Sequence, residues 1–112
     1  MQNYDLKQGD AYELPVKITQ DGVDIDLEEV ERIEFMIGRH LRRLYPDDVT
    51  TDETEEEGLV FNVPVEQTET MEIRSGQILR LDVRVKFNSG MVLGATEKPV
   101  ISIGESYSGE VL

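Results

Sequence analysis

The chain has 112 residues, no cysteine, and 24 acidic against 11 basic residues, for a formal net charge of −13 at pH 7. This length suits one domain with its own core, and the absence of cysteine excludes disulfide bonds and thiolate metal sites. The negative charge disfavours nucleic acid and anionic membranes as partners, because both would repel most of the surface. The sequence has neither a run of roughly 20 apolar residues that could cross a bilayer nor the apolar segment of a signal peptide, so we expect a protein made in the cytoplasm.

The N-terminal part has the pattern of short strands and turns. Residues 1–7 are polar and suit an edge strand or an arm. Residues 11–19 alternate apolar with polar side chains, which predicts a strand. Pro15 places that strand at a sheet edge or a bulge, because proline cannot donate a ladder hydrogen bond. An Asp-Gly pair at residues 21–22 predicts a turn, and residues 23–27 then look extended.

A second strong alternation covers residues 32–40, with large apolar side chains at every second position from residue 33 to residue 37. A helix over residues 28–44 competes with this strand, because apolar residues also recur there at helical spacing. We favour the strand, since its β-branched and aromatic side chains suit a pleated sheet and Gly38 would weaken a helix interior.

The most acidic part of the chain is residues 47–58, which hold seven carboxylates and Val49 as the one aliphatic residue. This composition predicts a loop that buries no core face. Alternation returns over residues 59–63. The polar segment 65–74 has room for one short helical turn over an open end of the sheets.

The other strands are organised around residues 78–103. Residues 79–87 alternate apolar with charged side chains, the Asn-Ser-Gly at 88–90 supplies a turn, and residues 91–93 can fold back to form a hairpin. A last apolar run follows at residues 99–103. Because one face of this hairpin is apolar and the other charged, the apolar face must be buried against a second layer.

These segments predict an all-β fold. We expect an immunoglobulin-like, two-sheet antiparallel β-sandwich of about seven to eight strands, with turn signals at the spacing typical of sandwiches. Residues 1–112 form a single domain in this interpretation. Its core spans about residues 6–103, with residues 1–5 as an arm and residues 104–112 as a tail.

Among the charged residues, a basic cluster is the one candidate site. Arg39, Arg42 and Arg43 flank the single His40 and precede the acidic segment 47–57. Attraction to those acids within the chain is the simplest role for the cluster. The alternative is a partner-binding patch, because a basic spot on an acidic protein can set the orientation of docking. His40 has no second histidine or local nucleophile beside it in the sequence, so we expect a surface or pairing role for it.

No segment carries the motif of a catalytic, cofactor or metal site. The acids at 21–26 and 47–57 offer oxygens of the kind that calcium prefers. Neither segment has the glycine and closing glutamate of an EF-hand at the required positions. We therefore expect no catalytic residue, no cofactor and no bound metal.

The order of these features resembles a known family. In sequence come a Gln-Gly-Asp before an alternating strand, an Asp-Gly with an Ile-Asp-Leu, an Ile-Glu-Phe-Met-Ile strand, a variable polar loop, a Gly-Leu-Val-Phe, a polar Gln-Thr link and the long hairpin. This order resembles the N-terminal domain of phage baseplate upper proteins and similar small tail-associated domains of phages and prophages. The resemblance covers roughly residues 6–103, at positions 8–18, 21–27, 33–37, 58–61 and 67–76 before the hairpin.

The resemblance implies a non-enzymatic β-sandwich that docks a module into a virion. We therefore expect a structural or assembly protein, found in a virion or the bacterial cytoplasm, whose partners are other virion or tail proteins or further copies of itself. A sheet edge near Pro15, or residues 1–7, would make the contact. The alternative is a host-side module that binds carbohydrate or peptide through the loops at one end of the sandwich.

Overall fold

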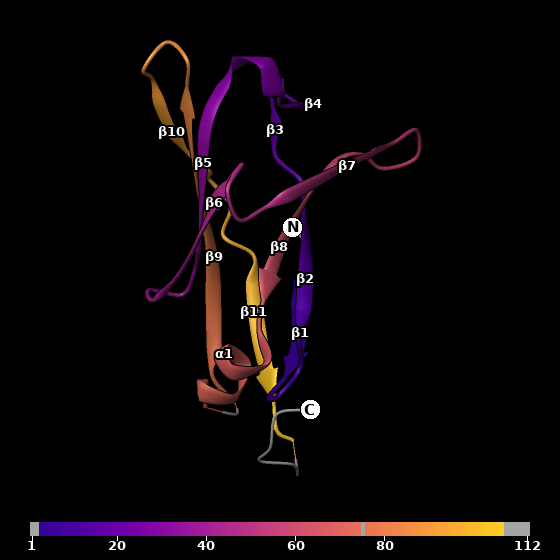
Figure 1. Cartoon of the computed structure of the whole chain (residues 1–112), viewed down its shortest axis with the longest axis vertical. Helices are drawn as coiled ribbons and strands as arrows, with labels where there is room; N and C mark the ends of the chain where they lie inside the picture. Colours follow the sequence, from indigo (N-terminus) through magenta and orange to yellow (C-terminus); the bar gives the residue numbers. More distant parts are fainter. Residues whose placement is uncertain (1–2, 75, 107–112) are drawn as a thin grey trace.

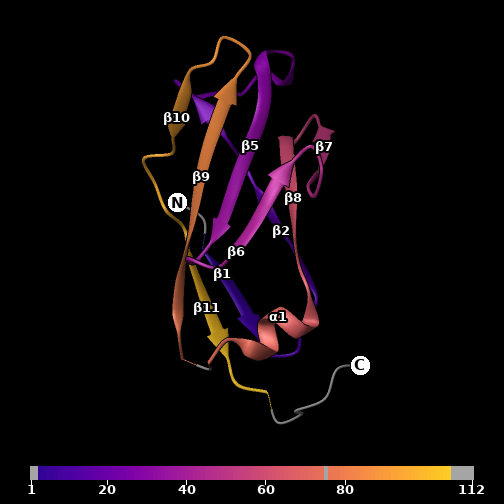
Figure 2. The same ribbon diagram turned by 60° about the vertical axis from the view of Figure 1, so that its left-hand side comes forward.

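The structure is a computed structural model that describes residues 3–74 and 76–106. Two β-sheets pack against each other, and a short helix, α1 (Gln67–Glu72), lies across one end (Figures 1 and 2). The larger sheet has the strand order β1-β11-β9-β5-β6, and β10 pairs with β9 beyond the end of β11. Its strands are β1 (Tyr4–Lys7), β5 (Val30–Ile37), β6 (Leu41–Tyr45), β9 (Ile78–Phe87), β10 (Val92–Gly94) and β11 (Val100–Gly104).

The smaller sheet has the strand order β2-β8-β7, and the two-stranded β3–β4 ribbon continues above it (Figure 1). A 3₁₀ turn, η1, leads from this ribbon into β5. The paired strands are antiparallel, except for β1 and β11, which run parallel. The elements are β2 (Tyr12–Val16), β3 (Thr19–Gln20), β4 (Val23–Asp24), η1 (Leu27–Glu29), β7 (Thr50–Thr54) and β8 (Gly58–Val65).

The core lies between the two sheets. Phe35 of β5 faces Phe61 of β8 with ring centroids 5.8 Å apart, and Tyr45 of β6 meets Phe61 edge-on at 5.4 Å. The apolar residues that recur at every second position of β5 and β9 point into this space, as the alternation predicts. The strand predicted over residues 32–40 is therefore confirmed as far as Ile37, whereas residues 38–40 form the turn into β6. The competing helix over residues 28–44 is wrong. Fully buried side chains from both sheets include Leu14, Ile33, Phe35, Phe61, Val63, Leu81 and Ile101.

The chain is all-β, as expected, but the strands are more numerous than the sequence suggested. The described residues form eleven strands, of which β3, β4 and β10 are only two or three residues long. The Asp-Gly turn is confirmed between β3 and β4, where Asp21 and Gly22 both have positive φ, at 54° and 79°. Both residues tolerate that conformation better than most side chains do.

Residues 4–7 form an edge strand and not a free arm. β1 pairs with β11, and its Tyr4 and Leu6 side chains are only 6% and 4% exposed. The Tyr4 hydroxyl donates to the carbonyl of Pro15 at 2.6 Å, which ties β1 to β2 of the other sheet. The core therefore begins at Tyr4. Of the expected tail, residues 107–112 lie outside the described residues.

The expected loop over residues 47–58 is wrong in two respects. Residues Thr50–Thr54 form β7, which pairs with β8, and Val49 is buried in the core at 3% exposure. Nearly all side chains of β7 are exposed, so backbone hydrogen bonds to β8, and not burial, hold this strand. A strand of that kind leaves no apolar alternation in the sequence.

The helical turn expected near residues 65–74 is confirmed as α1. Glu69 accepts from the N–H of Glu66, and Glu66 accepts from the N–H of Glu69 in return, so the two form a capping box. Thr70 is fully buried; its hydroxyl accepts from the N–H of Gly9 at 3.0 Å and donates to the carbonyl of Asp10 at 2.8 Å. These bonds fix α1 over the end of the sheets. Within the described ranges, no helix is long and apolar enough to cross a membrane.

Two residues of β9 test the packing of the sheets. Leu81 is fully buried, whereas Ile78 on the opposite face is 64% exposed. We expect Leu81→Ala to lower the free energy of unfolding by about 2–5 kcal/mol. Ile78→Ala should change it by no more than about 0.5 kcal/mol. Urea denaturation of the two variants measures both effects, and equal losses would contradict the assignment of the two faces.

Candidate functional site

The two ends of the sandwich differ. The end beside the termini of β1 and β11 is closed by α1, whereas the other end carries the β3–β4 and β9–β10 hairpins (Figure 1). The chain connecting β2 to β5 and the chain connecting β9 to β11 both pass through this second end. Connecting segments held on a rigid sheet are the usual place for a binding site.

A cleft of about 620 Å³ opens between these two connections. We call it the end cleft. Its floor is formed by inward side chains of β9 and by Tyr4 of β1, and its two walls by residues 16–25 and residues 93–99. The apolar side chains that line it include Val16, Ile18, Ile25, Val83, Val85, Phe87, Leu93 and Pro99.

Leu93 is the most informative residue of the end cleft. It lies opposite Val85 in the register of β10 and β9, so its side chain belongs to the inward, core-facing side of the sheet. Val85 is 7% exposed, but Leu93 is 42% exposed. The smaller sheet therefore does not extend far enough to cover Leu93. Met91 and Val92 beside it are also about half exposed, at 51% and 52%.

The outer edge of β10 is open to a further strand. The N–H of Phe87 donates to the carbonyl of Met91 at 2.9 Å, and the N–H of Ala95 donates to the carbonyl of Val83 at 2.8 Å. Hydrogen-bonded pairs alternate along an antiparallel ladder, so the polar backbone groups of Leu93 face β9. Those of Val92 and Gly94 face away from β9, where the described residues place no neighbouring strand.

The wall of the end cleft that includes β3 and β4 is held rigidly against β8. Asp24 accepts from the backbone N–H of Leu59 at 3.0 Å and pairs with Lys17 at 3.4 Å. The Leu59 hydrogen bond, followed by Lys17, holds the pKa of the Asp24 carboxyl below its ordinary value. Gly58 makes this approach possible, because it has a φ of +70° and an added Cβ would lie 2.3 Å from the Asp24 Oδ2 atom.

The polar groups around the end cleft are already engaged or lie at its rim. Burial raises the pKa of Tyr4 to about 12, so its hydroxyl stays protonated and donates to Pro15. Lys17 contacts Asp24 and the carbonyl of Glu57. The acidic side chains of Asp21 and Glu97 are exposed at the rim. The cleft thus combines an apolar floor with an acidic rim, which suits contact with an apolar segment that carries positive charge.

The structure does not gather the arginine cluster into one patch. Arg39 is exposed in the turn between β5 and β6, next to His40, which is also exposed. Arg42 and Arg43 are neighbours on β6 and therefore point to opposite faces of the sheet. Arg42 pairs with Glu34 on the outward face, and Arg43 pairs with Glu69 of α1 on the other side.

The ion pairs of Arg42 and Arg43 do not go to the acidic segment that follows them in the sequence. Arg43 also donates to the carbonyl of Pro64 at 3.1 Å, so it joins β6 to the chain entering α1. This is a structural role within the fold. On the outward face, Glu34 accepts from Arg42 at 2.7 Å and from Arg84 at 2.8 and 3.1 Å. The hydrogen bond from Arg42, followed by that from Arg84, lowers the pKa of Glu34.

The two acidic segments weighed as calcium sites are placed differently. Residues 21–26 form the β3–β4 turn and the entry to η1, where Asp26 caps the turn by accepting from the N–H of Glu28. Residues 50–57 form β7 and the turn into β8. Within the part of the chain that the structure describes, no group of three or more histidine, aspartate or glutamate side chains is placed to hold a metal ion.

Sequence reasoning missed the end cleft, although one signal pointed to it. The apolar run Met91-Val92-Leu93 is followed by a glycine and by residues 95–98, which do not continue the alternation. An apolar run without alternation beside the turn of a hairpin indicates an exposed apolar patch on the surface. Only the structure shows that the opposing sheet ends short of it.

Comparisons of the chain with models of protein families, with curated proteins and with solved structures give no match. No relative therefore assigns a role to the end cleft. Its use has to be inferred from its shape, its apolar floor and the open edge of β10.

The Glu34 network makes a prediction about pH. A carboxylate whose pKa is lowered in the folded state stabilises the fold above its unfolded pKa, about 4.3, and loses this contribution as the pH falls through the folded value. We expect Glu34→Gln to cost about 1 kcal/mol of unfolding free energy near neutral pH, and the difference from the unchanged protein to vanish in acid. Urea denaturation across the pH range measures it. Glu53→Gln, on exposed β7, is the control and should have little effect; a pH-independent loss for Glu34→Gln would contradict the account.

Proposed function

We propose that this chain is a non-enzymatic structural or assembly protein of a phage or prophage virion, which docks onto other tail or baseplate proteins through the end cleft. Two observations support this proposal. The order of sequence features over residues 6–103 resembles tail-associated β-sandwich domains. The docking role rests on the exposure of Leu93, whose core-facing side chain is 42% exposed beside an open strand edge.

We also infer that the two packed sheets are an immunoglobulin-like sandwich. In that fold, one sheet contains the second, fifth and fourth strands, and the other contains the third, sixth and seventh, extended in variable-type domains. The order β2-β8-β7 and the order β6-β5-β9-β11 fit this scheme, with β6 as the extension of the second sheet. The end cleft then lies between the two connections that correspond to binding loops in variable domains.

The open edge of β10 suggests how a partner docks. An extended segment of the partner would hydrogen-bond to the outward backbone groups of Val92 and Gly94 and add a strand to the larger sheet. Alternate side chains of that segment would point into the end cleft and cover Leu93. Among these inward side chains, those nearest the rim would meet Asp21 and Glu97, which favour lysine or arginine there.

The apolar contact gives this mode its strength. Burying a leucine side chain completely contributes about 1.5–3 kcal/mol, and main-chain hydrogen bonds contribute about 0.5–1.5 kcal/mol each. Association itself costs at least about 4 kcal/mol, with more for each side chain that is ordered. One strand in the end cleft therefore gives weak to moderate binding, which suits a module that is held at many equivalent positions of an assembly.

A second candidate function uses the same cleft. A host-side module for carbohydrate or peptide would also place its site between the connections at one end of a sandwich. The concave end cleft favours this alternative over one that uses a flat sheet face. Binding of glycans or free peptides by the isolated protein, without capture of tail proteins, would support it.

Replacement of Val92 tests the docking mode. Val92→Pro removes an outward N–H but no hydrogen bond to β9, so the fold should be kept while an added strand loses one bond. Val92→Thr is the matched control, because it keeps the N–H and a β-branched side chain. We expect Val92→Pro to reduce capture of tail and baseplate proteins encoded beside this chain by about two- to tenfold, which corresponds to one main-chain hydrogen bond. Leu93→Asp in the cleft should reduce capture by at least about tenfold, and pull-down and calorimetry measure both effects.

Unchanged melting temperatures would show that the variants are folded. Capture that is equal for all four proteins would contradict docking at β10, and failure of the unchanged protein to capture any of these tail proteins would contradict the virion role.

A further inference from the structure

A second surface of the chain is set apart by its charge. We call the outward side of β5, β6 and β9 the basic face. In the register of these strands, Arg32 lies opposite Lys86, and Glu34 lies opposite Arg84. The face holds five of the 11 basic residues of the chain but, within the described part, three of its 24 acidic residues, namely Glu31, Glu34 and Asp82. Its basic residues are Arg32, Arg42, Arg80, Arg84 and Lys86.

The arrangement of these cations is costly for the sheet alone. Like charges directly opposite each other on antiparallel strands are destabilising, and Arg32 and Lys86 are such a pair. Glu31, at the bulge of β5, lies 3.0 Å from Lys86 and offsets part of the cost, but both side chains are half exposed. A local conflict of this kind is expected where a surface serves a contact outside the fold.

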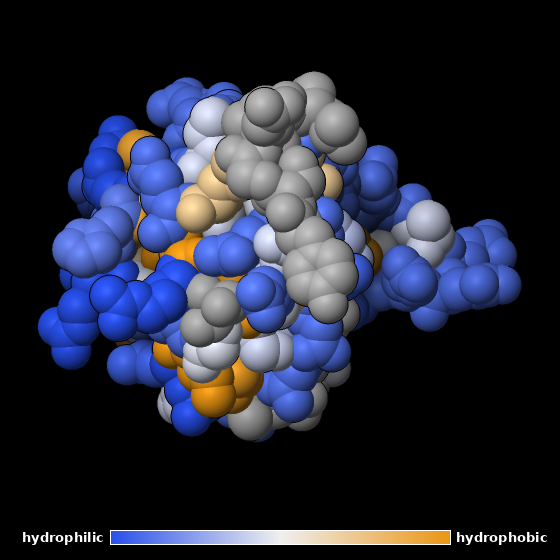
Figure 3. Space-filling view, turned by 90° about the horizontal axis from the view of Figure 1, so that it is seen from below, coloured by the Kyte–Doolittle hydropathy of each residue, from blue (hydrophilic) through white to orange (hydrophobic). Residues whose placement is uncertain are grey.

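The opposite charge is concentrated on the β7–β8 hairpin. Residues 52–57 carry five carboxylates and no basic residue, and all five side chains are exposed. We call this segment the acidic hairpin; its carboxylates are Asp52, Glu53, Glu55, Glu56 and Glu57. The hairpin projects from the body of the molecule (Figure 1), and the projection is hydrophilic along its length (Figure 3).

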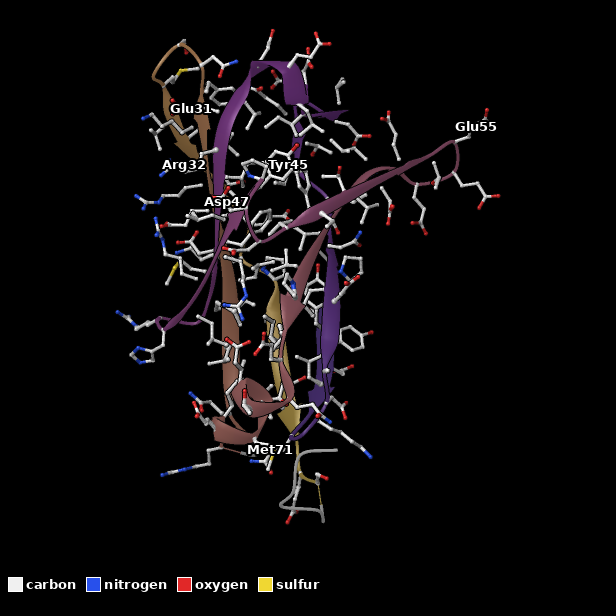
Figure 4. All side chains as sticks on the ribbon, in the orientation of Figure 1. Glu31, Arg32, Tyr45, Asp47, Glu55 and Met71 are labelled. Atoms are coloured by element: carbon white, nitrogen blue, oxygen red, sulfur yellow. The ribbon has the colours of Figure 1, made fainter. Side chains whose placement is uncertain are left out.

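The basic face and the acidic hairpin point away from each other. Figure 4 shows Glu31 and Arg32 on the side of β5 that is remote from the hairpin, with Glu55 at the far tip. Backbone pairing of β7 with β8 and the contact of Lys17 with Glu57 hold the hairpin in this direction. The hairpin therefore cannot fold back onto the basic face of its own chain, and the two complementary surfaces can meet only between molecules.

We propose that the basic face binds the acidic hairpin of a second copy of this chain. The two surfaces of one chain point away from each other, so two molecules cannot make both reciprocal contacts at once, and the contact is heterologous, with face against hairpin. Heterologous contacts build rings when the rotation closes and filaments when it does not. The end cleft is not used, so this contact and the docking proposed above can succeed or fail independently.

The net charge opposes this association at long range but not at contact. Two copies that each carry −13 repel each other, yet at about 0.1 M salt the Debye length is about 10 Å. Charges farther apart than that are screened, while the ion pairs of the interface remain. Apolar atoms add to the contact, because Ile78 on the same outward side is 64% exposed and Met36 and Leu44 are partly exposed.

A charge-swap experiment tests the proposal. Arg32→Glu/Arg80→Glu reverses two charges on the basic face, and Glu55→Lys/Glu56→Lys reverses two charges on the acidic hairpin. Neither double variant changes a residue of the Glu34 network. Sedimentation at about 0.1 M salt should show concentration-dependent association of the unchanged protein, lost at about 1 M. Each double variant alone should remain monomeric. A mixture of the two should regain association, because the unchanged hairpin of the first variant can meet the unchanged face of the second, and the reversed face can meet the reversed hairpin.

The hairpin variant separates this contact from simple repulsion. Glu55→Lys/Glu56→Lys lowers the negative net charge, so repulsion alone predicts stronger association, whereas the proposed contact predicts its loss. Glu13→Lys/Glu28→Lys, at exposed acids outside the hairpin, is the control with the same change in net charge, and it should associate at least as well as the unchanged protein. Association by the hairpin variant, a mixture that stays monomeric, or an unchanged protein that is monomeric at every concentration would overturn the proposal.

Discussion

The pairing of β5 with β9 is the constraint on which the rest of this structure depends. These two strands lie at the centre of the larger sheet, in continuous register from Arg32 with Lys86 to Ile37 with Leu81, and a bulge at Glu31 precedes this stretch. Because both alternate, a shift by one residue would turn every apolar side chain to solvent. The observed register places the apolar side against Phe61 of the smaller sheet and leaves the charged side to form the Glu34 network and the basic face.

Strands that bury one face could be predicted from the sequence, and strands held by the backbone alone could not. The alternations of β5 and β9 record the burial of every second side chain, and the polar segment before β9 left room for α1. The sequence of β7 has no such alternation, because its exposed threonines and acids contribute backbone hydrogen bonds to β8 and little packing. The acidity of residues 47–58 suggested a loop for this reason.

The candidate sites depend on which face of a sheet each side chain occupies and on where each sheet ends, and a sequence pattern alone gives neither. Adjacent arginines suggested a patch, but alternation along β6 sends Arg42 and Arg43 to opposite faces, where each meets a different glutamate. The apolar run that contains Leu93 indicates exposed apolar residues beside the hairpin turn, but it does not show that a core-facing side chain is left uncovered. Its exposure depends on where the opposing sheet ends, which is set by the lengths of β2 and the β3–β4 ribbon. The resemblance to tail-associated domains supplies the biological setting of the proposed function, and the open edge supplies its physical means.

Amide hydrogen exchange along β10 tests most directly whether the sandwich is open at this edge. In the isolated protein, the N–H of Leu93 should exchange slowly, because it is bonded to β9, as should that of Val85 opposite it. The N–H groups of Val92 and Gly94 should exchange rapidly, because they face away from β9. Slow exchange at Val92 and Gly94 in the isolated protein would show that the edge is already covered, and it would contradict the account.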